Sequence, residues 1–299
     1  MQISSVHVGA FTMELEVEIT DRLAMNYAAS VGDDNPLYLH DERDGGIIAP
    51  PLSCMEVTWP LSSEILMTWD IESFTEPFPF DLLQQQVHYR ETIVFHRVLR
   101  PGDKLRAKGT IAAILPHRAG TELVVRYDAV APDGTLMFTE YIGALLRRVR
   151  CLDEGRGAES LPAVPACPTP DACKWDLVLP IDPLAAHVYD GCTNMHFPIH
   201  TSVKFAKSVG LQGIILQGAA TLSYALREIT NREMDGDPTR MRSTSCTFTG
   251  MVTPGSSIHI RLLHRRDVDD GTELFYDVVN SEGRRAISGG YVLLGPSRL

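Results

Sequence analysis

The chain has 299 residues, of which 44% are hydrophobic and 22% charged, a composition typical of a soluble globular protein with room for two domains. Its net charge of −11 argues against a nucleic-acid-binding protein, because an acidic surface repels the phosphate backbone. No apolar run approaches the roughly 20 residues that a membrane helix needs. We therefore expect neither nucleic acid nor membrane as a partner.

The six cysteines form neither a CxxC pair nor a Cys/His metal spacing, so we expect free thiols, no metal and no cofactor. The first residues, MQISSVHVGAF, lack the charged and apolar regions of a secretory signal. The last three, Ser297-Arg298-Leu299, are close to the Ser-Lys-Leu peroxisomal address. The expected location is peroxisomal if the source is a eukaryote, and cytoplasmic otherwise.

The first elements along the chain are a strand and a helix. Residues 13–19 alternate apolar side chains with glutamate, which predicts a strand with one buried face. Thr20 or Asp21 can cap the helix that follows, and Gly32 supplies a left-handed stop at its end.

The rest of the first half predicts a turn, a helix and a run of strands. Residues 33–36 (DDNP) are a strong turn signal, and the apolar segment 52–69 predicts a helix broken near Pro60. Four strands separated by glycine-containing turns are then predicted over 87–100, 104–115, 121–130 and 135–149.

After a proline-rich stretch the same order returns. A polar loop from Asp190 to His200 precedes a short helix that begins at Thr201 or Ser202, and a longer helix begins at Gly218. Four strands are again predicted, over 242–252, 258–265, 273–279 and 285–294.

The two halves are an internal duplication. The segment VLRPGDKLRAKGTI matches MVTPGSSIHIRLLH, with Pro101 and Pro254 equivalent. Residues between the halves carry Pro, Gly and Glu without periodicity, which is linker composition. We therefore predict an N-terminal domain over 1–150, a linker over 151–173 and a C-terminal domain over 174–299.

Two motifs resemble those of the MaoC-like, (R)-specific enoyl-CoA hydratase (hydratase 2) superfamily. YAASVGDDNPLY, from Tyr27 to Tyr38, is similar to the family's G-D-x-N-P-L-H, and PIHT from Pro198 to ILQG ending at Gly218 is similar to P-I-H-T…I-L-H-G. The resemblance covers both halves. The resemblance implies an α+β double hotdog fold, in which each half wraps an antiparallel sheet around a long helix. It also implies a homodimer and an acyl-CoA substrate.

The family's reaction is the reversible addition of water to a trans-2-enoyl thioester. An Asp and a His activate the water, and an amide at a helix N-terminus polarises the thioester carbonyl. By position, the resemblance assigns the histidine role to His200 and the amide role to Gly218. The family's carboxylate falls on Met195 or Cys192, depending on the alignment, and Asp190 is the nearest acid. Asp190 can equally be the cap of a turn.

Residues expected to bind the substrate come from both halves. In the first half Asp33 and Asn35 keep the motif but Tyr38 replaces its histidine, and the two polar residues can instead be turn formers. In the second half Gln217 stands where the family has a histidine, and His196 lies beside the motif, where solvent exposure is the alternative.

Three functions remain open from the sequence. The first is a hydratase or dehydratase acting on an acyl thioester. The second, motivated by the displaced carboxylate, is a repurposed hotdog enzyme that dehydrates, isomerises or cyclises a polyketide or fatty-acid-derived compound. The third is a non-catalytic subunit that completes the site of another hotdog protein.

Overall fold

The computed structural model describes residues 1–168 and 173–299, which form two compact units that interleave along the chain. Unit 1 comprises Met1–Val17, Val57–Arg97 and Lys104–Val164; unit 2 comprises Glu18–Glu56, Val98–Asp103 and Pro165–Leu299. The helical front of the first half therefore clusters with the second half. The domain boundaries drawn from the sequence stay a prediction, and residues 169–172 of the predicted linker lie outside the described residues.

Unit 1 is built on a sheet with the strand order β2-β4-β5-β6-β3. Its strands are β2 (Leu15–Glu18), β3 (Gln86–Phe95), β4 (Lys104–His117), β5 (Gly120–Val130) and β6 (Leu136–Arg147). Neighbours from β4 to β3 pair antiparallel. Separately, β1 (Gln2–Ile3) pairs with β7 (Arg150–Cys151). The four strands predicted for the first half are confirmed, with their ends shifted by a few residues.

The helix of unit 1 crosses its proline without breaking. Helix α3 (Cys54–Ser63) continues through Pro60, and α4 (Ile65–Thr68) follows it, so the predicted break at Pro60 is wrong. Val57 and Leu61, on either side of the proline, are each 1% exposed. Burial of this face outweighs the one backbone hydrogen bond that proline cannot donate.

Between α3 and the sheet, unit 1 buries a cluster of acids that the sequence did not predict. His88 Nε2 lies 2.9 Å from Glu91 Oε2, and the Thr58 hydroxyl donates to Glu140. The two glutamates also share a hydrogen bond. Burial raises the pKa of both carboxyls well above the usual range and lowers the pKa of His88 to about 4. The cluster is therefore held as neutral, hydrogen-bonded groups.

This cluster makes the stability of the protein depend on pH. A carboxyl whose folded pKa is raised contributes stability that is present below its unfolded pKa and lost as pH rises through the folded pKa. We expect the unfolding free energy to fall as pH rises from the ordinary carboxyl pKa of about 4.5 towards the raised folded pKa, and Glu140→Gln to reduce that slope by on the order of 1 kcal/mol per pH unit. Urea unfolding at several pH values measures this, with the exposed Glu154→Gln as control. Parallel curves for the wild type and Glu140→Gln would show that Glu140 does not titrate differently on folding.

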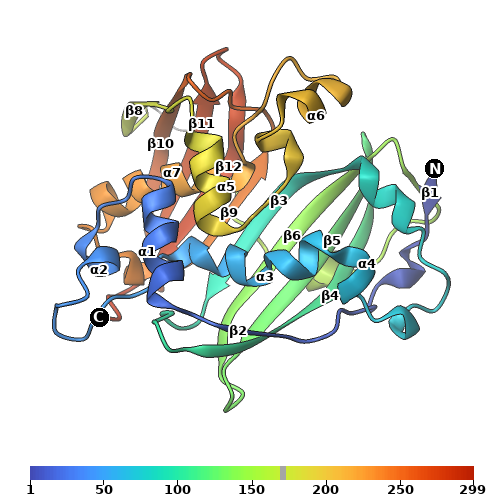
Figure 1. Cartoon of the computed structure of the whole chain (residues 1–299), viewed down its shortest axis with the longest axis horizontal. Helices are drawn as coiled ribbons and strands as arrows, with labels where there is room; N and C mark the ends of the chain where they lie inside the picture. Colours follow the sequence, from blue (N-terminus) through green and yellow to red (C-terminus); the bar gives the residue numbers. More distant parts are fainter. Residues whose placement is uncertain (169–172) are drawn as a thin grey trace. The chain divides into compact units, whose positions relative to one another are not determined.

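Unit 2 has a matching sheet with the order β9-β12-β11-β10-β8. The strands are β8 (Trp175–Pro180), β9 (Met241–Phe248), β10 (Ser257–Val268), β11 (Gly271–Asn280) and β12 (Arg285–Leu294), paired antiparallel throughout. The four predicted strands are confirmed, and the edge strand β8 was not predicted. Helix α7 (Gly218–Glu233) lies against this sheet (Figure 1). Its predicted apolar face is buried, with Leu222, Ala225 and Ile229 each 0% exposed.

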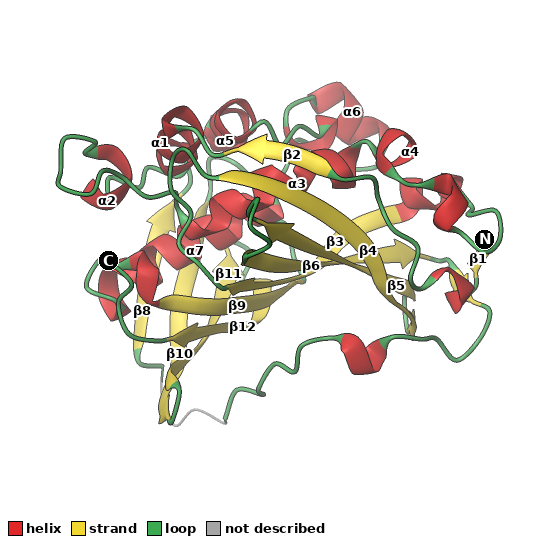
Figure 2. Cartoon of the chain, turned by 90° about the horizontal axis from the view of Figure 1, so that it is seen from below, coloured by secondary structure: helices red, strands yellow, loops and turns green. Residues whose placement is uncertain are grey.

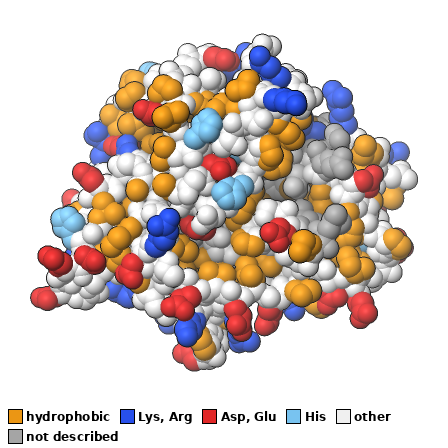
Figure 3. Space-filling view, viewed as in Figure 1, with side chains coloured by type: hydrophobic (Ala, Val, Ile, Leu, Met, Phe, Trp, Pro, Cys, Tyr) orange, Lys and Arg blue, Asp and Glu red, His pale blue; other side chains and the backbone are white. Residues whose placement is uncertain are grey.

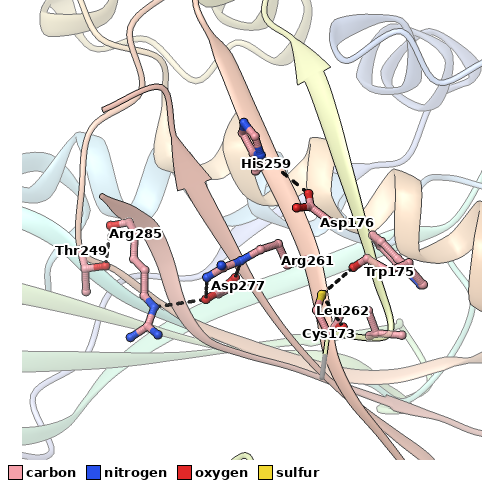
Figure 4. A network of polar contacts seen from close by, with 9 residues as sticks. All are labelled: Cys173, Trp175, Asp176, Thr249, His259, Arg261, Leu262, Asp277 and Arg285. Carbon is pink, nitrogen blue, oxygen red and sulfur yellow. Dashed lines mark hydrogen bonds and ion pairs between the residues drawn. The ribbon is translucent and has the colours of Figure 1, made fainter. Parts of the chain in front are cut away.

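An ion-pair network ties three strands of this sheet together. The Arg261 guanidinium on β10 donates to both oxygens of Asp277 on β11 at 2.7 Å, and Arg285 on β12 donates to the same carboxylate at 3.1 Å (Figure 4). The Asp277 side chain is 2% exposed. Two-point pairing of this kind fixes geometry as well as charge, so the network holds the strand register.

Shorter helices form the front of unit 2. They are α1 (Asp21–Ser30), α2 (Pro36–Leu39), α5 (Ala185–Thr193) and α6 (Val203–Ser208). As predicted, Thr20 caps α1 by accepting from the Leu23 amide at 3.1 Å, and Gly32 ends it with a φ of 60°. Helices α1 and α5 lie side by side (Figures 1 and 2), and the hydroxyls of Tyr27 and Tyr189 meet between them at 3.0 Å.

The loop predicted to begin at Asp190 is wrong in its first part. Asp190 lies inside α5, and the irregular chain begins only at Asn194, which has a φ of 55°. Ala186, Tyr189 and Thr193 are all at 0% exposure and form the buried face of the helix. Their burial outweighs the polar composition that predicted a loop.

No helix in the described part of the chain combines the length and apolar character needed to cross a bilayer.

Candidate active site

His200 is held as a neutral base. It ends the short 3-10 helix η6 (Pro198–His200), and its Nδ1 lies 2.8 Å from the carbonyl oxygen of Ile215. Because a carbonyl only accepts, Nδ1 carries the hydrogen and Nε2 keeps its lone pair. Burial lowers the pKa of His200, an effect opposed by the Ile215 hydrogen bond and by the charge of Asp190. The imidazole is therefore neutral near pH 7 and able to take a proton.

Asp190 contacts one histidine and acts electrostatically on a second. Its Oδ2 is 2.7 Å from Nδ1 of His196, and its charge acts on His200. The other carboxylate oxygen, Oδ1, is buried with no hydrogen-bond partner among the described residues. The His196 side chain is 63% exposed. The structure thus brings the predicted Asp190 and His196 into contact, places His200 within the electrostatic influence of Asp190, and leaves the buried Oδ1 without a donor among the described residues.

The N-terminus of α7 offers open backbone amides. Gly218 is its first residue, and Gln217 at the cap position makes no side-chain cap. Instead the Gln217 amide group donates to the Ala186 carbonyl at 3.0 Å, and its Oε1 is buried without a partner among the described residues. A helix N-terminus carries partial positive charge and free N–H donors. This end of α7 can therefore stabilise a developing negative charge.

Gly218 also packs closely. A Cβ added there would lie 3.2 Å from the Phe248 ring, so the site accepts only a small residue without adjustment.

Matched backbone hydrogen bonds show that unit 2 contains two copies of one front. In each copy, one backbone hydrogen bond joins the front segment to the residues just before the long helix. A second backbone hydrogen bond joins those residues to the turn before the next strand. The matched bonds are Ile48 to Leu37 (2.9 Å) with Ile215 to Ile199 (3.5 Å), and Ala49 to Leu99 (2.9 Å) with Leu216 to Val252 (2.8 Å). These bonds set the residue correspondence between the copies without a choice of alignment.

In this register the two copies have lost different groups. Asp33 corresponds to Met195, Tyr38 to His200, and Pro51 to Gly218. The first copy keeps the carboxylate but has no imidazole, and its proline has no N–H to donate. The second copy keeps the imidazole and the amide but has an apolar side chain where the carboxylate stood. The second copy is therefore the one equipped for proton transfer beside an amide donor.

The first-half candidates form a group of their own. Asn35 accepts from the Leu37 amide at 3.0 Å and donates to the Gly236 carbonyl at 2.7 Å, while Asp33 accepts from the Asn35 amide at 3.2 Å. Asp33 and Tyr38 line a cavity of about 30 Å³, which has room for about one water. Burial raises the pKa of Asp33 and, by more, that of Tyr38. Asn35 thus shapes the turn, as the structural alternative predicted.

Sequence reasoning missed one acid near the second copy. Glu56, in the first turn of α3, accepts from the Asn194 side chain at 3.0 Å. Burial raises the pKa of Glu56 to about 7, partly offset by that hydrogen bond. The two residues are 138 positions apart, so no local spacing could have linked them.

The surface beside His200 is apolar and basic. Phe197, 47% exposed, has its ring centroid 6.3 Å from that of His200. Val203 and the lysines Lys204 and Lys207 are exposed on α6, where Figure 3 shows basic atoms next to hydrophobic ones. Within the described residues, no three His, Cys, Asp or Glu side chains are grouped as metal ligands.

Comparison with known families matches both halves of the chain. Residues 171–282 match the MaoC like domain, and residues 6–138 match the FAS1-like, dehydratase domain region. His200 and Gly218 lie in the first of these matches, and Asp33 and Tyr38 in the second.

Two named proteins show similarity over parts of the chain. A probable enoyl-CoA hydratase 2 of Dictyostelium discoideum is 29% identical over 99 residues, 33% of this chain and 33% of that protein. A fatty acid synthase subunit beta of Aspergillus oryzae is 35% identical over 82 residues, 27% of this chain and 4% of that subunit. The chain thus matches a third or less of the length of these relatives.

Solved structures resemble the whole chain. The MaoC-like dehydratase of Phytophthora capsici has a TM-score of 0.81 at 21% identity, covering 98% of both chains. A Mycobacterium tuberculosis protein described as a double hotdog fold has a TM-score of 0.57 at 15% identity, covering 96% of both. At these identities the likeness shows the fold, which is the predicted α+β double hotdog.

Proposed function

We propose that this chain, whose residues 171–282 match the MaoC like domain and whose fold is a double hotdog, is a hydratase or dehydratase of enoyl and 3-hydroxyacyl thioesters. The observation that supports the proposal is that one copy of the repeat carries His200 with a fixed tautomer, the charge of Asp190 acting on it, and an uncapped N-terminus of α7. We propose acyl-CoA as the thioester, in line with the names of the hydratase relatives. As the assembly we propose a homodimer.

In the hydration direction, one water is held by the free oxygen of Asp190 and by Nε2 of His200. His200 removes a proton from this water as its oxygen bonds to C3 of the enoyl group. The C2–C3 π electrons move toward the thioester, and the carbonyl oxygen gains negative charge that the Gly218 amide stabilises. The proton returns from His200 to C2, which gives the 3-hydroxyacyl thioester. Dehydration is the same path reversed.

Asp190 supplies the carboxylate that Met195 lacks. In this proposal the acid comes from α5, and not from the turn before η6 where the family motif has it. Its negative charge stabilises the protonated form of His200 once the proton has been taken.

A repurposed activity is the second candidate, and the apolar Met195 favours it. A site that holds its acid on a different element presents a different shape to the acyl group. Such an enzyme would dehydrate, isomerise or cyclise a bulkier compound and leave simple enoyl-CoAs unchanged.

The test is turnover by the purified full chain. Incubation with short- and medium-chain trans-2-enoyl-CoA is expected to consume the enoyl absorbance and yield the 3-hydroxyacyl-CoA, and the hydroxyacyl-CoA is expected to regenerate the enoyl form. The saturated acyl-CoA serves as a blank. Binding of these thioesters without turnover in either direction would contradict the proposed reaction and favour the repurposed activity.

A further inference from the structure

The Glu56–Asn194 contact fixes the point at which the chain leaves α5. Asn194 follows the last residue of the helix in the left-handed region, at φ 55°, and its side chain donates to Glu56 Oε1 at 3.0 Å. Its backbone carbonyl accepts from the His196 amide at 3.1 Å. His196 in turn contacts Asp190 at 2.7 Å, and the chain then enters η6, which ends at His200. A change at Asn194 therefore reaches both the acid and the base of the proposed site.

The other copy shows what this junction looks like without the contact. The residue that corresponds to Asn194 is Gly32, which has a φ of 60°, and the residue that corresponds to Glu56 is Ser223. Glycine adopts this conformation without a side-chain anchor, whereas asparagine tolerates it at some cost. Ser223 bonds to the Tyr27 hydroxyl at 3.1 Å instead. The first copy is instead held at this point by the Arg227 guanidinium, which donates to the Gly32 carbonyl at 3.2 Å, so the carboxylate–amide contact occurs in the copy that carries His200.

We infer that Glu56 is a positioning residue of the proposed active site, acting through Asn194 to hold the segment that carries His196 and His200. The inference deepens the proposed function and rests on it for its kinetic consequences. Glu56 lies in the first turn of α3 and, like Asn194, belongs to unit 2, so the contact that orders the segment lies within one unit.

The environment of Glu56 makes this tether sensitive to pH. Its Oε2 is buried without a partner among the described residues, and burial raises the pKa of the carboxyl to about 7. The Tyr189 hydroxyl on α5 interacts electrostatically with Glu56, and the Tyr27 hydroxyl on α1 and the Cys54 thiol on α3 interact in turn with Tyr189. No base among these neutralises Glu56, so its charge changes near neutral pH while the Asn194 side chain can donate to either form.

Three variants test the tether. Glu56→Ala removes it, Asn194→Gly removes it while keeping the left-handed backbone of Gly32, and Glu56→Gln keeps an acceptor but no titration. We expect the first two to lower kcat by about 10- to 100-fold, as a displaced reacting group does, with KM nearly unchanged. Glu56→Gln should keep kcat within about threefold and lose an inflection near pH 7 from the kcat profile. Glu64→Ala, at an exposed position beyond the same helix, is the control.

A readout independent of turnover separates this inference from the proposed reaction. In the full chain, the imidazole NMR signals of His196 and His200 are expected to shift in Glu56→Ala and Asn194→Gly and to stay near wild type in Glu56→Gln and Glu64→Ala. This holds whether or not the protein hydrates enoyl-CoA. Unchanged imidazole signals and kcat in a folded Glu56→Ala would overturn the positioning role, as would a Glu56→Gln no better than Glu56→Ala.

Discussion

Replacing His200 by alanine is expected to lower kcat/KM for hydration of a medium-chain trans-2-enoyl-CoA by about 10²–10⁴-fold, the range that a general base contributes. The physical reason is the fixed tautomer. The Ile215 carbonyl oxygen, 2.8 Å from Nδ1, accepts a hydrogen bond from it. Nε2 alone is therefore left to accept the proton of the water. Steady-state hydration rates for the purified wild type and His200→Ala measure the effect.

The matched control is another histidine of the same unit. His187 is exposed on α5, and its Nε2 lies 3.3 Å from the Thr201 carbonyl. His187→Ala should leave kcat/KM within about threefold, because this imidazole has no part in the proposed proton transfer. A His200→Ala protein that keeps the wild-type rate would remove His200 from the mechanism.

The scaffold was readable from the sequence because its signals are periodic and repeated. Alternation of apolar and polar residues placed the strands, and the spacing of Leu222, Ala225 and Ile229 placed the buried face of α7. The turns that contain Pro101 and Pro254 exposed the duplication. Local pattern was enough here because each element buries one face and turns at glycine or proline.

The break predicted at Pro60 and the loop predicted at Asp190 show where local pattern fails. Both rested on residues with strong turn or helix-breaking preferences, and in both the structure is helical. Burial of a helix face contributes several kcal/mol, whereas a single unfavourable residue costs about 1–3. Tertiary packing therefore overrode propensity at these two places.

The site was only partly readable for a related reason. His200 and Gly218 lie in a contiguous motif, so their pairing could be proposed from spacing. Glu56 and the buried pair Glu91 and Glu140 come from segments far apart in the chain, and their contacts exist only after folding. No periodic or spacing signal marks such groups in a single sequence.

Gly218→Pro is expected to lower kcat by about 10²–10³-fold, the effect of removing one oxyanion donor. Proline deletes the N–H that we assign to the thioester oxygen, and it stands at the corresponding place, Pro51, in the first copy. The first helical position tolerates proline, and Gln217 already has the φ of −58° and ψ of 139° that a residue before proline adopts. The fold should therefore survive, as thermal unfolding of the variant will show.

Gly218→Ala is the control for this change. Both variants place a Cβ near the Phe248 ring, at 3.2 Å before adjustment, but alanine keeps the N–H. The difference between the two variants therefore reports the amide and not the packing.

The most direct test that the second copy performs the reaction is kcat for Gly218→Pro and Gly218→Ala, measured side by side on one enoyl-CoA. If the N-terminus of α7 stabilises the transition state, the proline variant is slower than the alanine variant by about 10²-fold or more at similar unfolding temperatures. Equal kcat values in the two folded variants would contradict a catalytic role for this amide and place the oxyanion donor elsewhere.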